Sequence, residues 1–146
     1  MDAKEYFQQI YDLTRKIEKL ELIAEEYDRL SYSVPGPVYG KEVTHSPNVN
    51  TEAPFVKWIH KKMEKEEEIK KAKEKLTILK AEAMLLIDTL ENPTEQLILT
   101  YRYIDLWGWK KISKKLNYAE SYIFELHREA TEIITKTLQE KEHSKS

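Results

Sequence analysis

The spacing of apolar side chains constrains the fold of this chain more than any other sequence feature. Near the N-terminus they recur in alternating steps of four and three residues, with no proline or glycine before Pro35. Because an α-helix turns once in about 3.6 residues, this spacing places them along one narrow stripe. The stripe consists of Tyr6, Ile10, Leu13, Ile17, Leu20, Ala24 and Tyr27. We therefore predict a long helix with one buried seam and solvated outer faces.

A second stripe of the same kind lies in Phe55–Glu91, which we predict to be the second long helix. Its members are Ile69, Ala72, Leu76, Leu79, Ala83, Leu86 and Leu90. Two such seams can bury each other when the helices fold back as an antiparallel hairpin. The alternative is that each seam packs against a partner chain, and the spacing is compatible with both.

The segment Ser31–Pro54 separates the two stripes and has a different composition. It contains four of the five prolines and two of the three glycines, and it has no helical period. Such a segment is typical of a connection. Residues 1–91 are therefore predicted to form a helical hairpin with a Pro/Gly-rich connecting loop at 31–54.

A new helix is predicted to begin after Asn92. Asn92 can cap it, Pro93 suits its first position, and Glu95 can complete a capping box by bonding back to the cap. We expect Gly108 to stop this helix. Its predicted buried face is Leu97, Ile98, Tyr101 and Ile104.

Two further helices are predicted, over Trp109–Leu116 and from about Ala119 onward. Asn117 between them can adopt the left-handed conformation that ends a helix. Their predicted buried residues are Trp109, Ile112 and Leu116 in one, and Ile123, Leu126, Ala130, Ile133 and Ile134 in the other. We thus predict an all-α chain, with the long antiparallel helical hairpin followed by a three-helix helix-turn-helix domain at 92–138 and a polar tail at 139–146.

Composition narrows the possible functions. The chain has no cysteine, no apolar run of the roughly 20 residues that span a membrane, and no apolar signal-peptide core at its start, so we expect a cytoplasmic protein. His45, His60 and His143 are scattered, which argues against a metal site. We find no glycine-rich phosphate loop and no nucleophile elbow, and we predict no catalytic residue, no cofactor and no enzyme.

The lysine cluster beside the predicted turn indicates nucleic-acid binding. Four lysines fall within six residues, on the helix face opposite Trp109 and Ile112. There they can contact phosphates, while the first turns of the next helix enter a major groove. The predicted DNA-binding residues are Lys110, Lys111, Lys114, Lys115, Tyr118, Ser121, Tyr122, Glu125 and Arg128. The lysines could also be an ordinary solvated face, and the tyrosines could cover a small core.

Three further residues of this region are not predicted to contact DNA. We expect Trp109 to be part of the core. Trp107 could be core or an exposed partner contact. His127, on the third helix, is expected to be a polar surface residue.

The run LILTYRYIDLWGWKKISKKLNYAESYIFELHREA resembles the helix-turn-helix of sigma-factor region four. Together with the upstream hairpin and its SVPGPV…SPNVN loop, it resembles phage-encoded regulators of Gram-positive prophages related to the RinA and ArpU activators of late genes. This resemblance implies a transcription regulator that binds double-stranded DNA in the cytoplasm of a bacterial host. It also implies contact with host RNA polymerase or with another phage or host protein.

The predicted recognition helix departs from that pattern. Ala119 stands at the cap and is followed by Glu120, and Glu125 is acidic where a basic residue is usual. Glutamate can accept a hydrogen bond from cytosine N4, but it is repelled by phosphates. Two hypotheses follow: a regulator that reads an unusual site, or a protein-interaction module that binds a repressor, a polymerase subunit or a packaging component with little or no DNA affinity. For either we expect a monomer or a homodimer.

Overall fold

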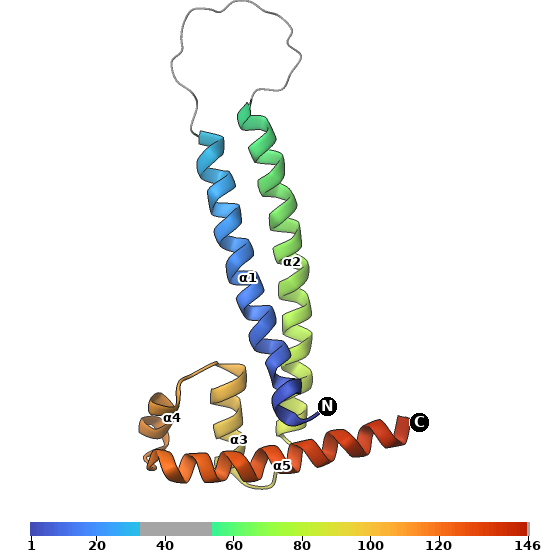
Figure 1. Cartoon of the computed structure of the whole chain (residues 1–146), viewed down its shortest axis with the longest axis vertical. Coiled ribbons are helices and arrows are strands. Elements are labelled where there is room, and N and C mark those ends of the chain that lie inside the picture. The colour runs from blue at the N-terminus through green and yellow to red at the C-terminus, as the bar shows by residue number, and fades with distance from the viewer. Residues whose placement is uncertain (33–53, 146) are drawn as a thin grey trace, which may run out of the picture. The chain divides into compact units, whose positions relative to one another are not determined.

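The computed structural model describes residues 1–32 and 54–145, and every regular element within them is helical (Figure 1). The all-α class is therefore confirmed. The predicted loop at 31–54 is helical at both of its ends, and its remainder lies outside the described residues. The elements are α1 (Ala3–Tyr32), α2 (Pro54–Ile87), α3 (Pro93–Leu99), the π-helical turn η2 (Thr100–Ile104), α4 (Trp109–Leu116) and α5 (Glu120–Lys145).

The chain divides into two compact units. Unit 1 comprises Met1–Thr14 together with Lys75–Ser146, and unit 2 comprises Arg15–Glu74. The start of α1 and the end of α2 thus belong to the same unit as α3, η2, α4 and α5. The predicted site residues all lie in unit 1.

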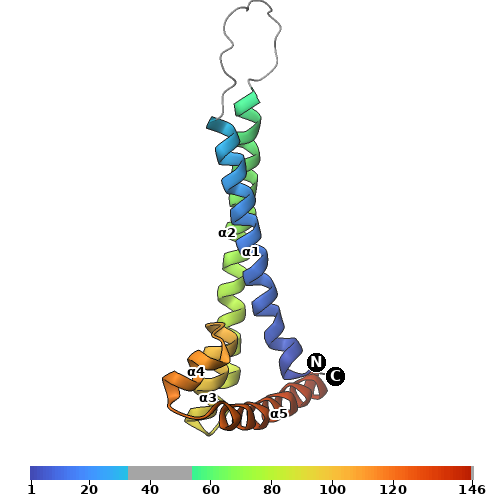
Figure 2. The same cartoon turned by 60° about the vertical axis from the view of Figure 1, so that its left-hand side comes forward.

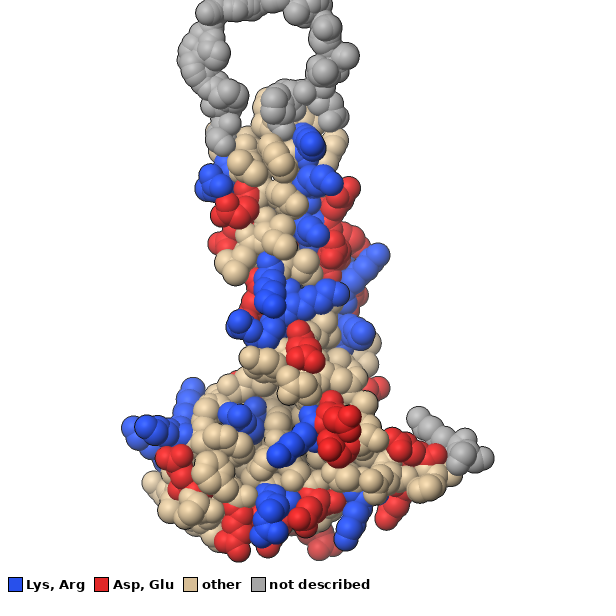
Figure 3. All heavy atoms as spheres, in the orientation of Figure 1, with Lys and Arg blue, Asp and Glu red and all other residues tan. Residues whose placement is uncertain are grey.

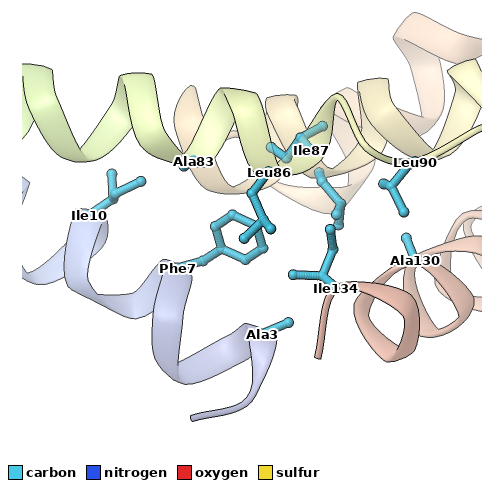
Figure 4. Packing of buried hydrophobic residues seen from close by; sticks show 10 residues of the cluster. Ala3, Phe7, Ile10, Ala83, Leu86, Ile87, Leu90, Ala130 and Ile134 are labelled. Atoms are coloured by element: carbon cyan, nitrogen blue, oxygen red, sulfur yellow. The ribbon is translucent and has the colours of Figure 1, made fainter. Parts of the chain in front are cut away.

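A buried cluster around Phe7 forms the larger core of unit 1 (Figure 4). Phe7 is fully buried, and its ring stacks on that of Tyr103 with centroids 4.6 Å apart. Side chains from α1, α2, α3 and α5 surround it, so four helices share this one core. Its buried members are Ala3, Phe7, Ile10, Ala83, Leu86, Ile87, Leu90, Leu99, Ala130 and Ile134.

A second, smaller cluster holds α3, α4 and α5 together. Its buried members are Ile98, Ile112, Ile123 and Leu126, and partly buried Tyr101, Trp107, Trp109 and Leu116 pack against them. As predicted, Trp109 belongs to this core. The cluster joins a short helix of eight residues to the first turns of the much longer α5, and packing rather than intrinsic propensity therefore stabilises so short a helix.

Two predicted core residues face water instead. Leu97 is 40% exposed, whereas its neighbours Ile98 and Leu99 are fully buried in the small and the large cluster respectively. Two sides of α3 are therefore covered, and Leu97 lies on the third. Ile133 is 44% exposed, because Ala130 and Ile134 set the buried face of α5 there. The prediction for Leu97 was wrong because it assumed a single buried side of α3, and the prediction for Ile133 was wrong because this residue lies beside the buried stripe of α5.

Unit 2 consists of the Arg15–Tyr32 part of α1 beside the Pro54–Glu74 part of α2, running in opposite directions (Figure 2). Tyr27 stacks on Trp58 at 5.6 Å between ring centroids. Lys62 Nζ lies 2.8 Å from the Asp28 carboxylate. Lys73 forms a similar ion pair with Glu21. The buried residues of unit 2 are Ile17, Leu20, Ala24, Ile69 and Ala72.

Candidate nucleic-acid interface

The entry to α4 is formed by Leu106 and not, as predicted, by a glycine stop. The preceding helix ends in η2, where the Asp105 N–H donates to the Thr100 carbonyl at 3.0 Å. Leu106 then takes a φ of 58°, which reverses the chain, and the Trp107 N–H donates to the Tyr101 carbonyl at 2.8 Å. A left-handed leucine costs about 1–2 kcal/mol. Gly108, with an extended φ of −75° and ψ of 162°, is instead the N-cap of α4.

Asn117 makes the turn between α4 and α5, as the sequence predicted. Its φ of 61° and ψ of 40° are left-handed, and its N–H donates to the Ser113 carbonyl. The Ser113 hydroxyl donates to the Tyr118 carbonyl at 2.5 Å, so one serine closes the turn from both sides. Sequence reasoning did not identify Ser113. A serine four residues before an expected left-handed asparagine is the signal that could have found it.

The N-terminus of α5 begins directly after this turn. The Ala119 carbonyl accepts from the N–H groups of Tyr122 and Ile123, each at 3.1 Å. An alanine offers no side-chain oxygen to the remaining N–H groups, so the first turn of α5 is left open to an external acceptor or to water.

The small core leaves the lysine face of α4 in solvent. Ile112 is fully buried, and the four lysines on the opposite face are exposed. Figure 3 shows the basic side chains gathered over α4, with acidic side chains beside the start of α5. Within residues 1–32 and 54–145, none of these four lysines forms an ion pair, so their charges remain available to a ligand.

Lys111 differs from the other three lysines because an aromatic stack holds it. Its ammonium group lies 4.1 Å from the centre of the Trp107 ring. Trp107 in turn stacks on Tyr101, with the rings 4.3 Å apart and only 3° from parallel. Trp107 is therefore partly buried, and one face of its ring packs against the Lys111 side chain. A cation placed in this way loses less side-chain entropy when it meets an anion.

The outward face of α5 presents Ser121, Glu125 and Arg128 on successive turns, all exposed. Tyr118 and Tyr122 lie beside this face, 42% and 44% exposed, and their rings meet edge-on at 5.0 Å. The nine predicted residues are thus brought together on α4, the turn and the first turns of α5.

Phe124 is an exposed aromatic residue of α5 that the sequence analysis missed. It is 45% exposed, and its ring edge contacts Trp109 with centroids 5.1 Å apart. It therefore extends the aromatic border of the α5 face on the side opposite the tyrosine pair.

His127 is partly buried between α5, η2 and α4, and is not the surface residue that was predicted. Its Nε2 is 2.5 Å from the Tyr103 hydroxyl, and its ring contacts Trp109 edge-on at 4.9 Å. Burial, together with the positive charges of Lys4 and Arg102, lowers the pKa of His127 to about 4. A neutral histidine here ties α5 to η2.

Arg102 was not identified from the sequence, and it fixes the segment before α4. Its guanidinium group lies 4.4 Å from the centre of the Trp109 ring and donates to the Trp107 carbonyl at 3.1 Å. An arginine in an apolar-aromatic run such as YRYIDLWGW is the signal for such a stacking contact.

The cap of α3 is confirmed, but the capping box is not. The Asn92 side chain accepts from the Thr94 N–H at 2.9 Å, with Pro93 in the first position. Glu95 is only 5% exposed, and its carboxyl group lies close enough to that of Glu129 on α5 to interact with it. Burial raises the pKa of Glu95, and Glu129 raises it further. The contact with α5 thus replaces the local bond that the sequence suggested.

Residues 1–32 and 54–145 contain no group of three or more His, Cys, Asp or Glu side chains placed to hold a metal ion. In the same residues, no helix is both long and apolar enough to cross a membrane.

Comparison with known families places the candidate interface in a shared region. Residues 51–135, more than half of the chain, match the family described as Protein of unknown function (DUF1492). The chain belongs to the DUF1492 family. The DUF1492 match includes all of α3, η2, α4 and the turn before α5. No curated protein and no solved structure matches the chain.

Proposed function

We propose that this DUF1492 protein is a DNA-binding transcription regulator of phage or prophage genes. In this proposal α3, α4 and α5 act as a three-helix helix-turn-helix, preceded by an antiparallel hairpin of α1 and α2. The first turns of α5 enter the major groove, and α4 lies along the phosphate backbone.

One observation carries the proposal: a short helix with four unpaired lysines is joined by a left-handed Asn117 to a long helix whose first turns are exposed. Lys110, Lys111, Lys114 and Lys115 would hold phosphates, which sets affinity and register but not sequence. Tyr118, Ser121, Tyr122, Glu125 and Arg128 would face bases or the adjacent backbone. The open N-terminus of α5 adds N–H groups that suit a phosphate.

The phage setting and the contact with host RNA polymerase rest on the resemblance of Leu97–Ala130 to sigma-factor region four and to the RinA/ArpU regulators. The sequence features that carry this resemblance are the YRYI stretch, the aromatic-led α4 and the alanine within α5. We propose double-stranded DNA as the main partner, with polymerase or another phage or host protein as a second one, and a monomer or homodimer as the active species.

Titration of duplex DNA at two salt concentrations tests the proposal. Fragments of the encoding genome, including its promoters, are titrated with the full chain at about 50 and about 200 mM salt. Four phosphate contacts predict a logarithmic salt slope of about −3.6, so the affinity should fall about a hundredfold over this range. Absence of binding to every fragment at the lower salt concentration would overturn the proposal.

A second candidate function is a protein-interaction module with little or no DNA affinity. Glu120 and Glu125 at the start of α5 favour it, since both carboxylates would lie near phosphates. Exposed apolar side chains of unit 2, such as Tyr32 at 77% and Met63 at 60%, also favour a protein partner. Capture from host lysate with and without nuclease separates the two functions, because a protein bound directly survives nuclease treatment.

A further inference from the structure

We infer that Glu125 selects cytosine in the DNA target, which makes it a specificity-determining residue and not merely an unfavourable charge. This inference rests on the proposed DNA-binding function and names one base that the interface reads. Glu125 lies on the exposed face of α5, one turn after Ser121 and one turn before Arg128.

The Glu125 carboxylate is exposed and free to accept a hydrogen bond. Among the described residues no hydrogen bond or ion pair joins it to the chain. Ile123 and Leu126 on either side are buried in the small core, so the position of Glu125 is fixed by packing. The backbone of Glu125 is therefore held in place, while its exposed carboxylate is free to turn toward a hydrogen-bond donor.

The chemistry of the major groove determines what such a carboxylate can meet. Cytosine presents the N4 amino group there and no acceptor of its own, whereas guanine presents two acceptors, thymine one acceptor and adenine an acceptor beside its donor. A carboxylate, which only accepts, is therefore stabilised by cytosine and repelled by the acceptors of the other bases. The side chain thus discriminates by attraction and by repulsion together.

Nearby cations offset the repulsion between Glu125 and the phosphates. Arg128 lies three residues further along the same face, and its only ion pair in the described chain is a long, exposed one with Glu132 at 3.8 Å. The lysines of α4 are unpaired on the neighbouring helix. The interface can therefore tolerate one carboxylate directed at a base while its cations bind the backbone.

A base-preference experiment with the full-length chain tests this inference. Wild type, Glu125→Gln, Glu125→Ala and the control Glu132→Gln are each used to select from a random duplex library. The selected site is then titrated with each of the four base pairs at every position. The control removes the same charge from the same helix face, two turns further along, and circular dichroism checks that each variant is folded.

We expect one position at which wild type prefers cytosine by at least about fivefold. Glu125→Gln should shift that preference to adenine, because an amide bonds adenine N6 and N7 together. Glu125→Ala should remove the preference, and Glu132→Gln should keep it while binding all sequences somewhat more tightly. A preference unchanged in Glu125→Gln would overturn the inference but leave DNA binding intact. Failure of the wild type to bind DNA would overturn the proposed function and this inference together.

Discussion

The two units of this chain use similar helices but bury them to different degrees. Every one of the largest fully buried side chains lies in unit 1: Phe7, Ile10, Ile87, Ile98, Leu99, Ile112, Ile123 and Ile134. In unit 2 the most buried seam residue, Ile17, keeps 5% of its surface exposed, and ion pairs flank the seam. Two helices alone cannot enclose a side chain as several helices do. A rigid arrangement of side chains is therefore expected in unit 1, where the candidate interface lies.

Core truncation should show the largest difference between the units. Ile123→Ala removes a fully buried side chain from the small cluster and should lower the free energy of unfolding by about 4 kcal/mol. Ile17→Ala in unit 2 should cost about 2 kcal/mol, because the two-helix seam can relax around the cavity. Urea denaturation followed by circular dichroism measures both. Equal losses would contradict the contrast between the units.

Acidification should weaken unit 1 through His127. Its pKa is about 4 in the folded chain and near 6.5 when unfolded, so between these values the unfolded chain binds more protons. Stability should therefore decrease as the pH falls from about 6.5 toward 4, by at most about 3 kcal/mol.

Variants at two histidines isolate this effect from the titration of carboxylates. His127→Gln should show a flatter stability profile than wild type between pH 4 and 6.5 in thermal unfolding. His60→Gln, at an exposed position of unit 2, should follow wild type. If His127→Gln retained the full acid dependence, protonation of His127 at its contact with Tyr103 would not be the cause of that dependence.

Lysine substitutions should weaken DNA binding when they are made in unit 1 and have little effect when they are made in unit 2. Lys114→Ala with Lys115→Ala should reduce the magnitude of the salt slope by about 1.8 and weaken binding about tenfold. The matched control, Lys16→Ala with Lys19→Ala, removes two exposed lysines from unit 2 and should leave the slope unchanged. Equal loss in both pairs would indicate general electrostatic attraction instead of a defined interface.

The smallest effect is expected from the ion pairs of unit 2. Lys62→Ala breaks the 2.8 Å contact with Asp28 and the longer one with Glu66. All three side chains are substantially exposed, so solvent screening keeps the loss well below that of Ile17→Ala. Thermal unfolding at low and high salt measures it. A loss as large as that of Ile17→Ala would show that charge, and not the apolar seam, holds unit 2.

The helical class and the main helix boundaries could be predicted because local signals agree with the fold. Asn92 and Pro93 mark the start of α3, and Asn117 marks the end of α4. Both signals act within a few residues of the chain, so a sequence is sufficient to find them.

The features that could not be predicted depend on contacts between several helices that are distant in the sequence. Phe7 lies off the seam that Tyr6 and Ile10 define, yet it is the centre of a core that α1, α2, α3 and α5 share. The π-helical η2 and the left-handed Leu106 break the regular helical spacing on which the prediction relied. His127 and Glu95 looked polar and local, but their partners Tyr103 and Glu129 are distant in the sequence.

Within the candidate site, the sequence was sufficient to predict which residues lie close together. It was not sufficient to predict the contacts that hold them in place. The four lysines and the α5 face follow from helical spacing. The Trp107 stack under Lys111 and the Ser113 bond that closes the turn are tertiary details. They decide how rigid the interface is.

The most direct test of the account is an amide chemical-shift titration of the isotope-labelled full chain with its selected duplex. We predict that shifts concentrate in residues 110–128, on α4, the turn and the first turns of α5, and that residues 15–32 and 54–74 remain unchanged. Shifts confined to unit 2, or no shifts at protein and DNA concentrations that saturate binding, would contradict the claim that α4 and α5 form the DNA interface.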